Sequence, residues 1–214
     1  MKSLIFSGHM IRAIFAGRKT QTRRVVRMTT RARAAIGDRS PIEAAPGYFH
    51  WENLPTAPSF NGEAYNVWCL SYYKPGDQLY VQETFAAHPY HPDALTMPEY
   101  EGGHNPAHLV YRADVRDGMI DGFDDTRPKW KSPRYMPRWA SRLTIELTEI
   151  RLERVQAISE QDAKAEGIGC CGPGGSCCCN SRKFSELWDR INGKRAPWDS
   201  NPWVWVLEFR RVED

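Results

Sequence analysis

The spacing of hydrophobic positions predicts three short helices. The first follows Ser7-Gly8, where apolar residues recur every three to four positions: Met10, Ile11, Ile14 and Phe15. Gly17 stands where this helix is expected to end. A second helix, over residues 160 to 166, begins at a sequence typical of a capping box, Ser159-Glu160-Gln161-Asp162. The third has i, i+3, i+4, i+7 spacing and ends before a glycine at position 193: Phe184, Leu187, Trp188 and Ile191.

Alternating positions predict strands around these helices. Residues 20 to 26 are expected to leave the first helix as a strand or extended turn. Residues 78 to 85 follow the turn sequence Lys74-Pro75-Gly76-Asp77 and place four residues on one face: Leu79, Val81, Glu83 and Phe85. Apolar and polar residues alternate over 142 to 150, and residues 109 to 111 form a short apolar run. A last strand, over 203 to 210, has one strongly apolar face: Trp203, Trp205, Leu207 and Phe209. Strands with short helices between them and no β-α-β repeat predict an α+β fold around a small mixed barrel.

Three stretches lose this periodicity, over about residues 27 to 66, 88 to 128 and 169 to 182. Prolines at positions 41, 46, 55 and 58 break the first stretch, and the second is rich in proline, glycine and acidic residues. We expect them to be irregular insertions in a single domain over residues 1 to 214. A chain of this length can bury a core without disulfides or metal.

Glu83 is the residue that does not fit the apolar face of its strand. Burial of an isolated carboxylate is costly, so Glu83 must be paired, hydrogen-bonded or functional. The sequence leaves two alternatives open: a structural pair with an arginine, or a role in binding a substrate.

Composition narrows the class of protein. The chain is 41% hydrophobic and 26% charged with a mean hydropathy of -0.60, values that exclude disordered, collagen-like and membrane proteins. No apolar run approaches the roughly 20 residues of a membrane helix. The apolar stretch at the start is too short for a signal peptide, so we expect a cytoplasmic protein that does not bind membranes.

Positive charge is concentrated in two segments. The net charge is +3, yet residues 1 to 39 hold ten basic residues and one acid, Asp38. Residues 127 to 142 hold six basic residues and no acid, interleaved with Trp130, Tyr135 and Trp139. Basic side chains attract phosphates and aromatic rings stack on bases, so a nucleoside or nucleic acid is the expected ligand, although a solvated basic face is the alternative. Trp139, beside Arg138, is the best stacking candidate.

Five of the six cysteines lie in one segment: Cys170, Cys171, Cys177, Cys178 and Cys179. Adjacent cysteines do not match the paired CxxC spacing of structural zinc sites, so we expect no metal site, and a loop that oxidises or wraps a soft metal stays an alternative. Glycine-rich phosphate loops and the GxSxG and HExxH motifs are absent, which removes the common hydrolase, kinase and dehydrogenase templates, and no cofactor is expected.

Three segments together resemble the ASCH family. They are the sequence MIRAIFAGRKTQTRR over residues 10 to 24, the turn at 74 to 77 with its strand, and the closing WVWVLEF over 203 to 209. The segments MPRWASR at 136 to 142 and FSELW at 184 to 188 are similar to the longer ASCH proteins of bacteriophages and prophages. The resemblance implies a PUA-like β-barrel with short flanking helices and loop insertions.

The resemblance also implies a function. Some short bacterial ASCH proteins are metal-independent amidohydrolases that remove the acetyl group of N4-acetylcytidine with a lysine, a threonine three residues later and a glutamate on a helix. The matching positions here are Lys19, Thr22 and Glu166. The substrate would be an N4-acylcytosine nucleoside or a related modified base, free or within RNA. Candidate substrate-binding residues are Arg18, Arg23, Arg24, Glu83, Arg138 and Trp139.

This chemistry is reasonable from the side chains alone. Thr22 could attack the amide with a neutral Lys19 as base, or water could attack with help from Lys19 and Glu166. The negative end of the preceding helix favours a protonated Glu166, suited to protonating the leaving amine. In a regular strand Lys19 and Thr22 would face opposite sides, so a bend is required. The alternative functions are a non-catalytic RNA-binding or modified-nucleic-acid-binding module and a nuclease, for which no acid-base pair is evident.

Overall fold

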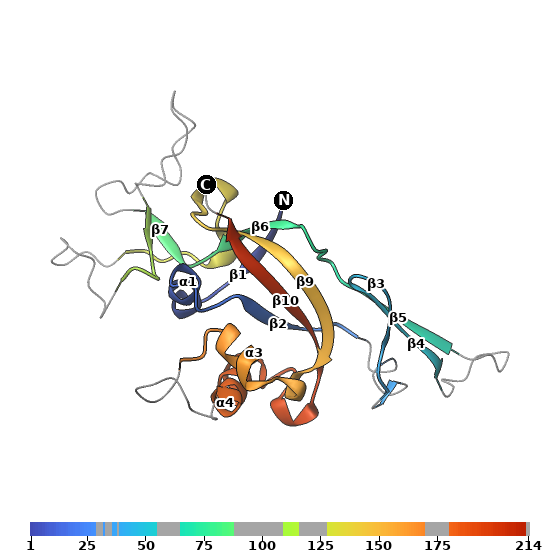
Figure 1. The fold of residues 1–214 in the computed structure, drawn as a ribbon. Coiled ribbons are helices and arrows are strands. Elements are labelled where there is room, and N and C mark those ends of the chain that lie inside the picture. Colours follow the sequence, from blue (N-terminus) through green and yellow to red (C-terminus); the bar gives the residue numbers. More distant parts are fainter. Residues whose placement is uncertain are drawn as a thin grey trace. The chain divides into compact units, whose positions relative to one another are not determined.

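The computed structural model describes residues 1–28, 32, 36–37, 39–54, 65–87, 109–115, 128–169 and 180–212. The fold is α+β, dominated by sheets with a few helices (Figure 1). The chain divides into two compact units, and strands β9 (Thr144–Arg154) and β10 (Trp203–Val212) contain residues of both. Unit 1 consists of Met1–Lys19, Gln78–Glu146 and Arg210–Asp214; unit 2 consists of Thr20–Asp77 and Leu147–Phe209.

In unit 1, a parallel pair of strands lies beside a short helix, α1 (Gly8–Phe15). Strand β1 (Lys2–Ile5) pairs in parallel with β6 (Gln78–Gln82), which pairs antiparallel with the first residues of β9. A second, antiparallel pair joins β7 (Phe85–Ala87) to β8 (Leu109–Tyr111). Two single-turn helices, η2 (Pro133–Tyr135) and η3 (Arg138–Ala140), follow. Their apolar residues complete a small core with the β7–β8 pair: Phe85, Leu109, Tyr111, Met136 and Ala140.

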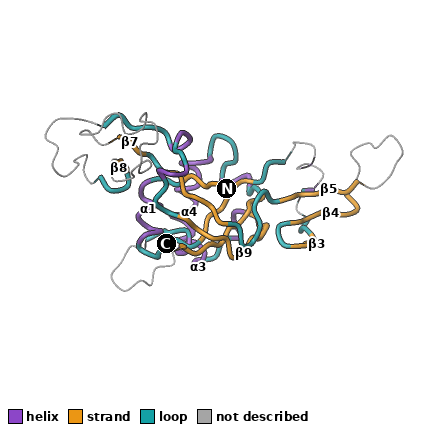
Figure 2. The backbone as a smooth tube through the Cα atoms, turned by 90° about the horizontal axis from the view of Figure 1, so that it is seen from above, coloured by secondary structure: helices purple, strands orange, loops and turns teal. Residues whose placement is uncertain are grey.

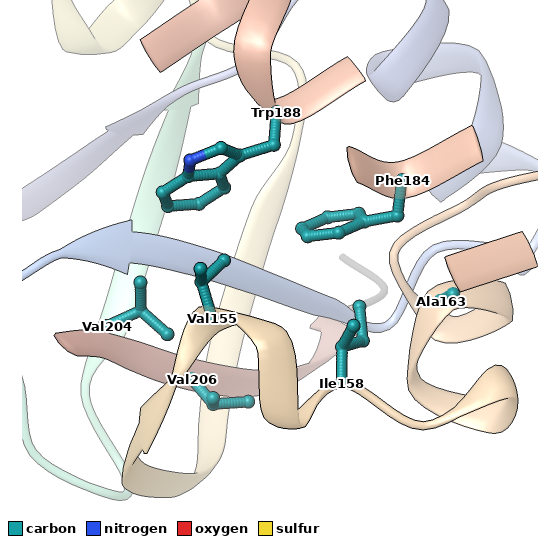
Figure 3. Close-up of a cluster of buried hydrophobic side chains, with 7 residues drawn as sticks. All are labelled: Val155, Ile158, Ala163, Phe184, Trp188, Val204 and Val206. Atoms are coloured by element: carbon teal, nitrogen blue, oxygen red, sulfur yellow. The ribbon is translucent and has the colours of Figure 1, made fainter. Parts of the chain in front are cut away.

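In unit 2, two helices pack on a sheet of β2 (Gln21–Val25), β10 and the rest of β9. Strand β10 runs antiparallel to β2, with Val204 opposite Val25 and Glu208 opposite Gln21. Helices α3 (Glu160–Ala165) and α4 (Asn180–Asn192) lie against one another, and α3 contacts β2. Figure 3 shows Phe184 and Trp188 pointing from α4 into the core of this unit. That core consists of Val155, Ile158, Ala163, Phe184, Trp188, Val204 and Val206.

Unit 2 also contains a three-stranded antiparallel sheet, in which β3 (Ile42–Ala45), β4 (Tyr48–Leu54) and β5 (Tyr65–Leu70) lie side by side (Figure 2). It contacts β10 through aromatic side chains. The Phe49 and Trp205 rings are 5.6 Å apart between centroids, and those of Trp51 and Trp203 are 5.5 Å apart. Aromatic pairs in this distance range contribute beyond the area they bury.

The structure confirms the three predicted helices, the short strand at 109 to 111 and the α+β class. It differs from the sequence analysis in several strands. Strands β3 and β4 lie in the stretch expected to be irregular, the strand expected over 78 to 85 stops at Gln82, and the strand expected over 142 to 150 extends to Arg154. Strands β1 and β5 had no prediction. The described strands form open sheets and do not close a barrel. Within the described residues, no helix has the length and apolar character needed to cross a bilayer.

Candidate functional site

The end of α1 determines where Lys19 lies. Gly17 has φ +67°, a left-handed conformation that glycine adopts without strain and that commonly ends a helix. The backbone N–H groups of Arg18 and Lys19 then donate to the Ala13 carbonyl oxygen at 2.9 and 3.1 Å. Lys19 is only 1% exposed, and its Nζ lies 5.7 Å from the centroid of the Phe6 ring. Arg18 is exposed, so the turn buries the lysine and directs the neighbouring arginine to solvent.

Thr22 lies in β2, where Gln21, Thr22 and Arg23 are buried in succession. The strand begins after Thr20, so Lys19 precedes it and is not held to the alternation of a regular strand. The backbone N–H of Thr20 donates to the Ala165 carbonyl oxygen at 2.8 Å, which attaches the start of β2 to the end of α3. Alternation within β2 places Thr22 and Arg24 on one face and Gln21 and Arg23 on the other.

Glu166 is positioned by a short, doubly capped helix. The predicted capping box is present: the Ser159 hydroxyl accepts from the Asp162 N–H at 3.0 Å, and the Asp162 carboxylate accepts from the Ser159 N–H at 3.3 Å. Glu166 is the C-terminal cap of α3, and its N–H donates to the Asp162 carbonyl oxygen at 2.8 Å. The Glu166 residue is 6% exposed. Asp162 and Glu166, four residues apart, therefore share one face of the helix.

The carboxylates of Asp162 and Glu166 both lie against the guanidinium of Arg23. Arg23 Nη2 is 3.3 Å from Asp162 Oδ2, and Arg23 Nη1 is 3.7 Å from Glu166 Oε1. Arg23 Nη2 also donates to Glu153 Oε2 at 3.4 Å, and Nη1 donates to the amide oxygen of Gln21. The Arg23 side chain has no exposed area. Its guanidinium is thus held by protein groups, which argues against the substrate-binding role predicted for it.

Arg24, on the opposite face of β2, is half-buried and close to charged partners. Burial lowers the pKa of its guanidinium, while the charges of Glu166 and Tyr73 act to raise it. Burial in turn raises the pKa of the Tyr73 phenol, and the positive charge of Arg24 opposes that rise. Thr22, Arg24, Tyr73 and Glu166 are therefore the polar groups from which a site in unit 2 can be built. Tyr73 lies between β5 and the turn at residues 74 to 77, and no motif in the sequence marks it as a site residue.

Asp162 should make the stability of unit 2 depend on pH. Burial raises the pKa of its carboxyl, but hydrogen bonds from Gln21 and Ser159 and the charge of Arg23 outweigh burial and lower it overall. A carboxyl with a lowered folded-state pKa stabilises the protein above its unfolded pKa, and this contribution disappears as pH falls through the folded value. We expect Asp162→Asn to cost about 2 kcal/mol at pH 7. Urea unfolding at pH 7 and pH 3 measures this; a cost that stays equal at both pH values would contradict the ion-pair account.

In unit 1, Glu83 forms the structural pair that the sequence analysis left open. Arg142 binds it in two places, with Nε 2.9 Å from Oε1 and Nη2 3.2 Å from Oε2. The same guanidinium binds Asp114 at 2.6 and 2.9 Å and lies 4.0 Å from the centroid of the Tyr111 ring. Burial raises the pKa of Glu83, and Arg142 opposes the rise by hydrogen bonding and charge. Both carboxylate oxygens are bound to protein, so the geometry supports the structural alternative for Glu83.

The basic and aromatic segment after residue 127 lies on the surface of unit 1. Lys129, Lys131, Arg134 and Arg138 are all exposed. Trp139 is half-buried and packs against the core of unit 1, whereas Tyr135 is 77% exposed. Of these two rings, that of Tyr135 is the more exposed and is therefore the better placed for stacking.

The cysteine segment lies outside the described residues. Cys69 is described and buried, and burial raises the pKa of its thiol to about 11. Such a thiol is a poor nucleophile at neutral pH. Within the described part of the chain, no cluster of histidine, cysteine and acidic side chains could hold a metal ion.

Comparison with known proteins does not identify a family. No family model and no curated protein matches the chain. Among solved structures, the crystal structure of protein EF3133 from Enterococcus faecalis V583, assigned to the family DUF984, is similar with 10% sequence identity. The match covers 99% of this chain and 81% of that chain with a TM-score of 0.39. A likeness of this degree shows neither a shared fold nor a shared function.

Proposed function

We propose that the protein is an ASCH-type amidohydrolase with a PUA-like fold that removes acyl groups from N4-acylcytosine nucleosides. One observation carries the proposal: the three residues at the motif positions are buried, with exposed fractions of 1% for Lys19, 4% for Thr22 and 6% for Glu166. The intervening Thr20 is exposed. Lysine and glutamate are seldom buried without a partner or a function. Burial of all three at motif positions supports a reactive site more than a solvated basic face.

Two cations of β2 act on the Glu166 carboxylate. Arg23 Nη1 lies 3.7 Å from Oε1, and the charge of Arg24 interacts with the same carboxylate. These two cations oppose the negative end of α3, on which the expectation of a protonated Glu166 rested. In the proposed reaction Glu166 therefore begins as a base, and it becomes the acid only after it has taken up a proton.

The overall reaction consumes one water and breaks the bond between the acyl carbon and N4. The attacking oxygen, from Thr22 or from water, loses its proton as it bonds to the acyl carbon. Glu166 receives that proton directly or through Lys19 and delivers it to N4, which leaves as the amino group of cytosine. If Thr22 attacks, water then hydrolyses the acyl-threonine ester. Both routes release the carboxylic acid and the cytosine nucleoside.

Purified protein incubated with N4-acetylcytidine tests this proposal. Cytidine, separated by chromatography, is expected to accumulate with multiple turnovers and without added metal. Parallel samples contain N4-acetylcytidine within an RNA oligonucleotide, because the segment after residue 127 is basic. If neither substrate releases cytidine, the proposed amidohydrolase activity is contradicted.

A second candidate is a non-catalytic RNA-binding module, favoured by the exposed segment with Arg138 and Tyr135 in unit 1. Each arginine or lysine that binds a phosphate makes affinity depend on salt, and a stacked aromatic ring contributes about 1–3 kcal/mol per base.

We expect Tyr135→Ala to weaken binding to single-stranded RNA about tenfold. Arg138→Ala should reduce the slope of log affinity against log salt by about one. Fluorescence anisotropy at several salt concentrations measures both effects. Lys194→Ala, an exposed lysine of unit 2, is the matched control. If this control and the two variants bind RNA equally, the segment is a solvated face.

A further inference from the structure

We propose that Arg23 is a positioning residue, whose buried positive charge acts on the Glu166 carboxylate, while Gln21 and Asp162 hold Arg23 in place. The inference rests on the proposed function, because it assigns a role to Glu166 in the reaction. It replaces the substrate-binding role that the sequence suggested for Arg23.

The guanidinium of Arg23 links β2 to two carboxylates at α3. Arg23 Nη2 and Nη1 reach two carboxylates one helical turn apart, Asp162 at 3.3 Å and Glu166 at 3.7 Å. The longer contact exceeds hydrogen-bond distance, so Arg23 acts on Glu166 Oε1 by charge and not by donating a hydrogen bond. A cation at this distance favours the ionised carboxylate. Arg23 therefore stabilises the charged form of Glu166 without bonding to that oxygen.

Arg23 is also enclosed and held by its neighbours. Its side chain has no exposed area, and its guanidinium carbon lies 5.8 Å from the centroid of the Phe184 ring. The Gln21 amide, which accepts from Arg23, donates in turn to Asp162 at 3.0 Å and to Glu208 at 3.2 Å. Such a supporting shell keeps a charged group within the narrow range of positions that catalysis requires.

A second arginine, Arg151, holds two of the carboxylates that contact Arg23 and Gln21. Arg151 Nε is 3.0 Å from Glu153 Oε1, and Arg151 Nη1 is 2.6 Å from Glu208 Oε1. Glu153 and Glu208 are thereby held in place, and both contact the inner group, Glu153 through Arg23 and Glu208 through Gln21. The network extends from the surface of unit 2 to the buried guanidinium.

Among the described residues, two elements place charged groups close to Glu166. Strand β2 contributes the cations Arg23 and Arg24, and α3 contributes the carboxylate of Asp162. Helix α4 contributes the apolar ring of Phe184, whose centroid lies 5.8 Å from the guanidinium carbon of Arg23. Removal of Arg23 takes away the cation whose guanidinium lies 3.7 Å from the Glu166 carboxylate.

The test uses variants that balance charge, because Arg23→Gln alone leaves buried carboxylates without a cation and can prevent folding. The main variant is Arg23→Gln combined with Glu153→Gln. Glu153→Gln alone is the matched control, since it removes a carboxylate bound to Arg23 and retains the contact with Glu166. Arg23→Lys restores the positive charge.

Two readouts are measured on the same proteins. The acid limb of kcat against pH for N4-acetylcytidine should move up by about one pH unit in the double variant and stay in place in the control. In protein labelled with ¹³C at the glutamate carboxyl carbon, the resonance assigned by Glu166→Gln should show the same upward shift of its titration midpoint. Arg23→Lys should reverse most of both shifts.

These readouts separate the two proposals. Equal titration midpoints for Glu166 in the double variant and the control would overturn the role of Arg23, whatever the activity. A shifted midpoint in a protein that does not hydrolyse N4-acetylcytidine would support the effect of the Arg23 charge on Glu166. It would overturn the proposed amidohydrolase activity and, with it, a role for Arg23 in that reaction.

Discussion

Lys19→Met and Glu166→Gln are each expected to lower kcat for N4-acetylcytidine by about 10²–10⁴-fold, the range typical for loss of a group that transfers protons. Both substitutions keep the size of a buried side chain, so they remove the ionisable group without opening a large cavity. Lys19 and Glu166 are 1% and 6% exposed, and a truncation to alanine would confuse loss of chemistry with loss of packing. Initial rates of cytidine release at saturating substrate measure the effect.

Thr22→Val distinguishes the two routes of attack. If the threonine oxygen attacks the acyl carbon, the loss should be as large as for Glu166→Gln. If water attacks, the loss should stay below about tenfold, because the hydroxyl then only orients substrate. Trapping with hydroxylamine during turnover detects an acyl-threonine ester in the first case.

Exposed residues of the same three types serve as matched controls. Thr20→Val, Lys164→Met and Glu186→Gln change the same residue types where the side chains face solvent. We expect these three to retain wild-type turnover, and urea unfolding should show all six variants folded. Turnover within twofold of wild type in both Lys19→Met and Glu166→Gln would rule out the assigned residues.

The helices were predictable because their signals are local. The capping box at Ser159 and Asp162 forms within four residues of the chain, and Gly17 with φ +67° ends α1 where a left-handed residue is needed. Such interactions depend on neighbouring residues, and their energies of about 1 kcal/mol each do not depend on distant parts of the fold.

The sheet of β3, β4 and β5 was not predictable from periodicity. Prolines were interpreted as breaking residues 27 to 66, yet the structure places Pro41 directly before β3 and Pro46 in the turn between β3 and β4. Gly47, with φ +76°, completes that turn. These residues mark the ends of strands, as proline does in sheets. The aromatic contacts of this sheet with β10 join residues about 150 positions apart, which no local pattern reveals.

The same limit explains the arginines of the candidate site. The run from Arg18 to Arg24 was interpreted as one ligand-binding surface, whereas alternation along β2 sends Arg23 and Arg24 to opposite faces. The partners of Arg23 lie 130 to 143 positions further along the chain, at Glu153, Asp162 and Glu166. The i, i+4 spacing of Asp162 and Glu166 was a usable signal, because it predicts two carboxylates on one face of α3.

Arg142→Met is expected to cost about 3–5 kcal/mol of unfolding free energy at pH 7, the largest stability effect in unit 1. Glu83 is 2% exposed, and Arg142 is the cation that binds both of its oxygens. Without the guanidinium the carboxylate stays buried with its charge uncompensated. The variant also loses the contact of the guanidinium with the Tyr111 ring, 4.0 Å from its centroid.

An exposed ion pair of the same unit provides the control. Arg210 Nη2 lies 3.0 Å from Glu146 Oε2, but the Arg210 side chain is 68% exposed. Exposed pairs of this kind contribute about 0–1 kcal/mol, so Arg210→Met should lower the unfolding free energy by at most about 1 kcal/mol. Urea unfolding of both variants gives the comparison. Equal costs would show that burial of Glu83 is not the cause.

The sign of the pH dependence identifies Glu83 as the source of the cost. Burial already raises its pKa, and loss of Arg142 removes the group that opposes the rise. A carboxyl whose folded-state pKa exceeds its unfolded value binds a proton more readily in the folded protein, so stability rises as pH falls toward the unfolded value of about 4.3. The loss of unfolding free energy in Arg142→Met should therefore become smaller between pH 7 and pH 5. Combining Arg142→Met with Glu83→Gln removes the buried charge, so the double variant should recover the part of the loss that this charge causes. A deficit that is constant over this range and unchanged in the double variant would assign the cost to lost packing on Tyr111 instead.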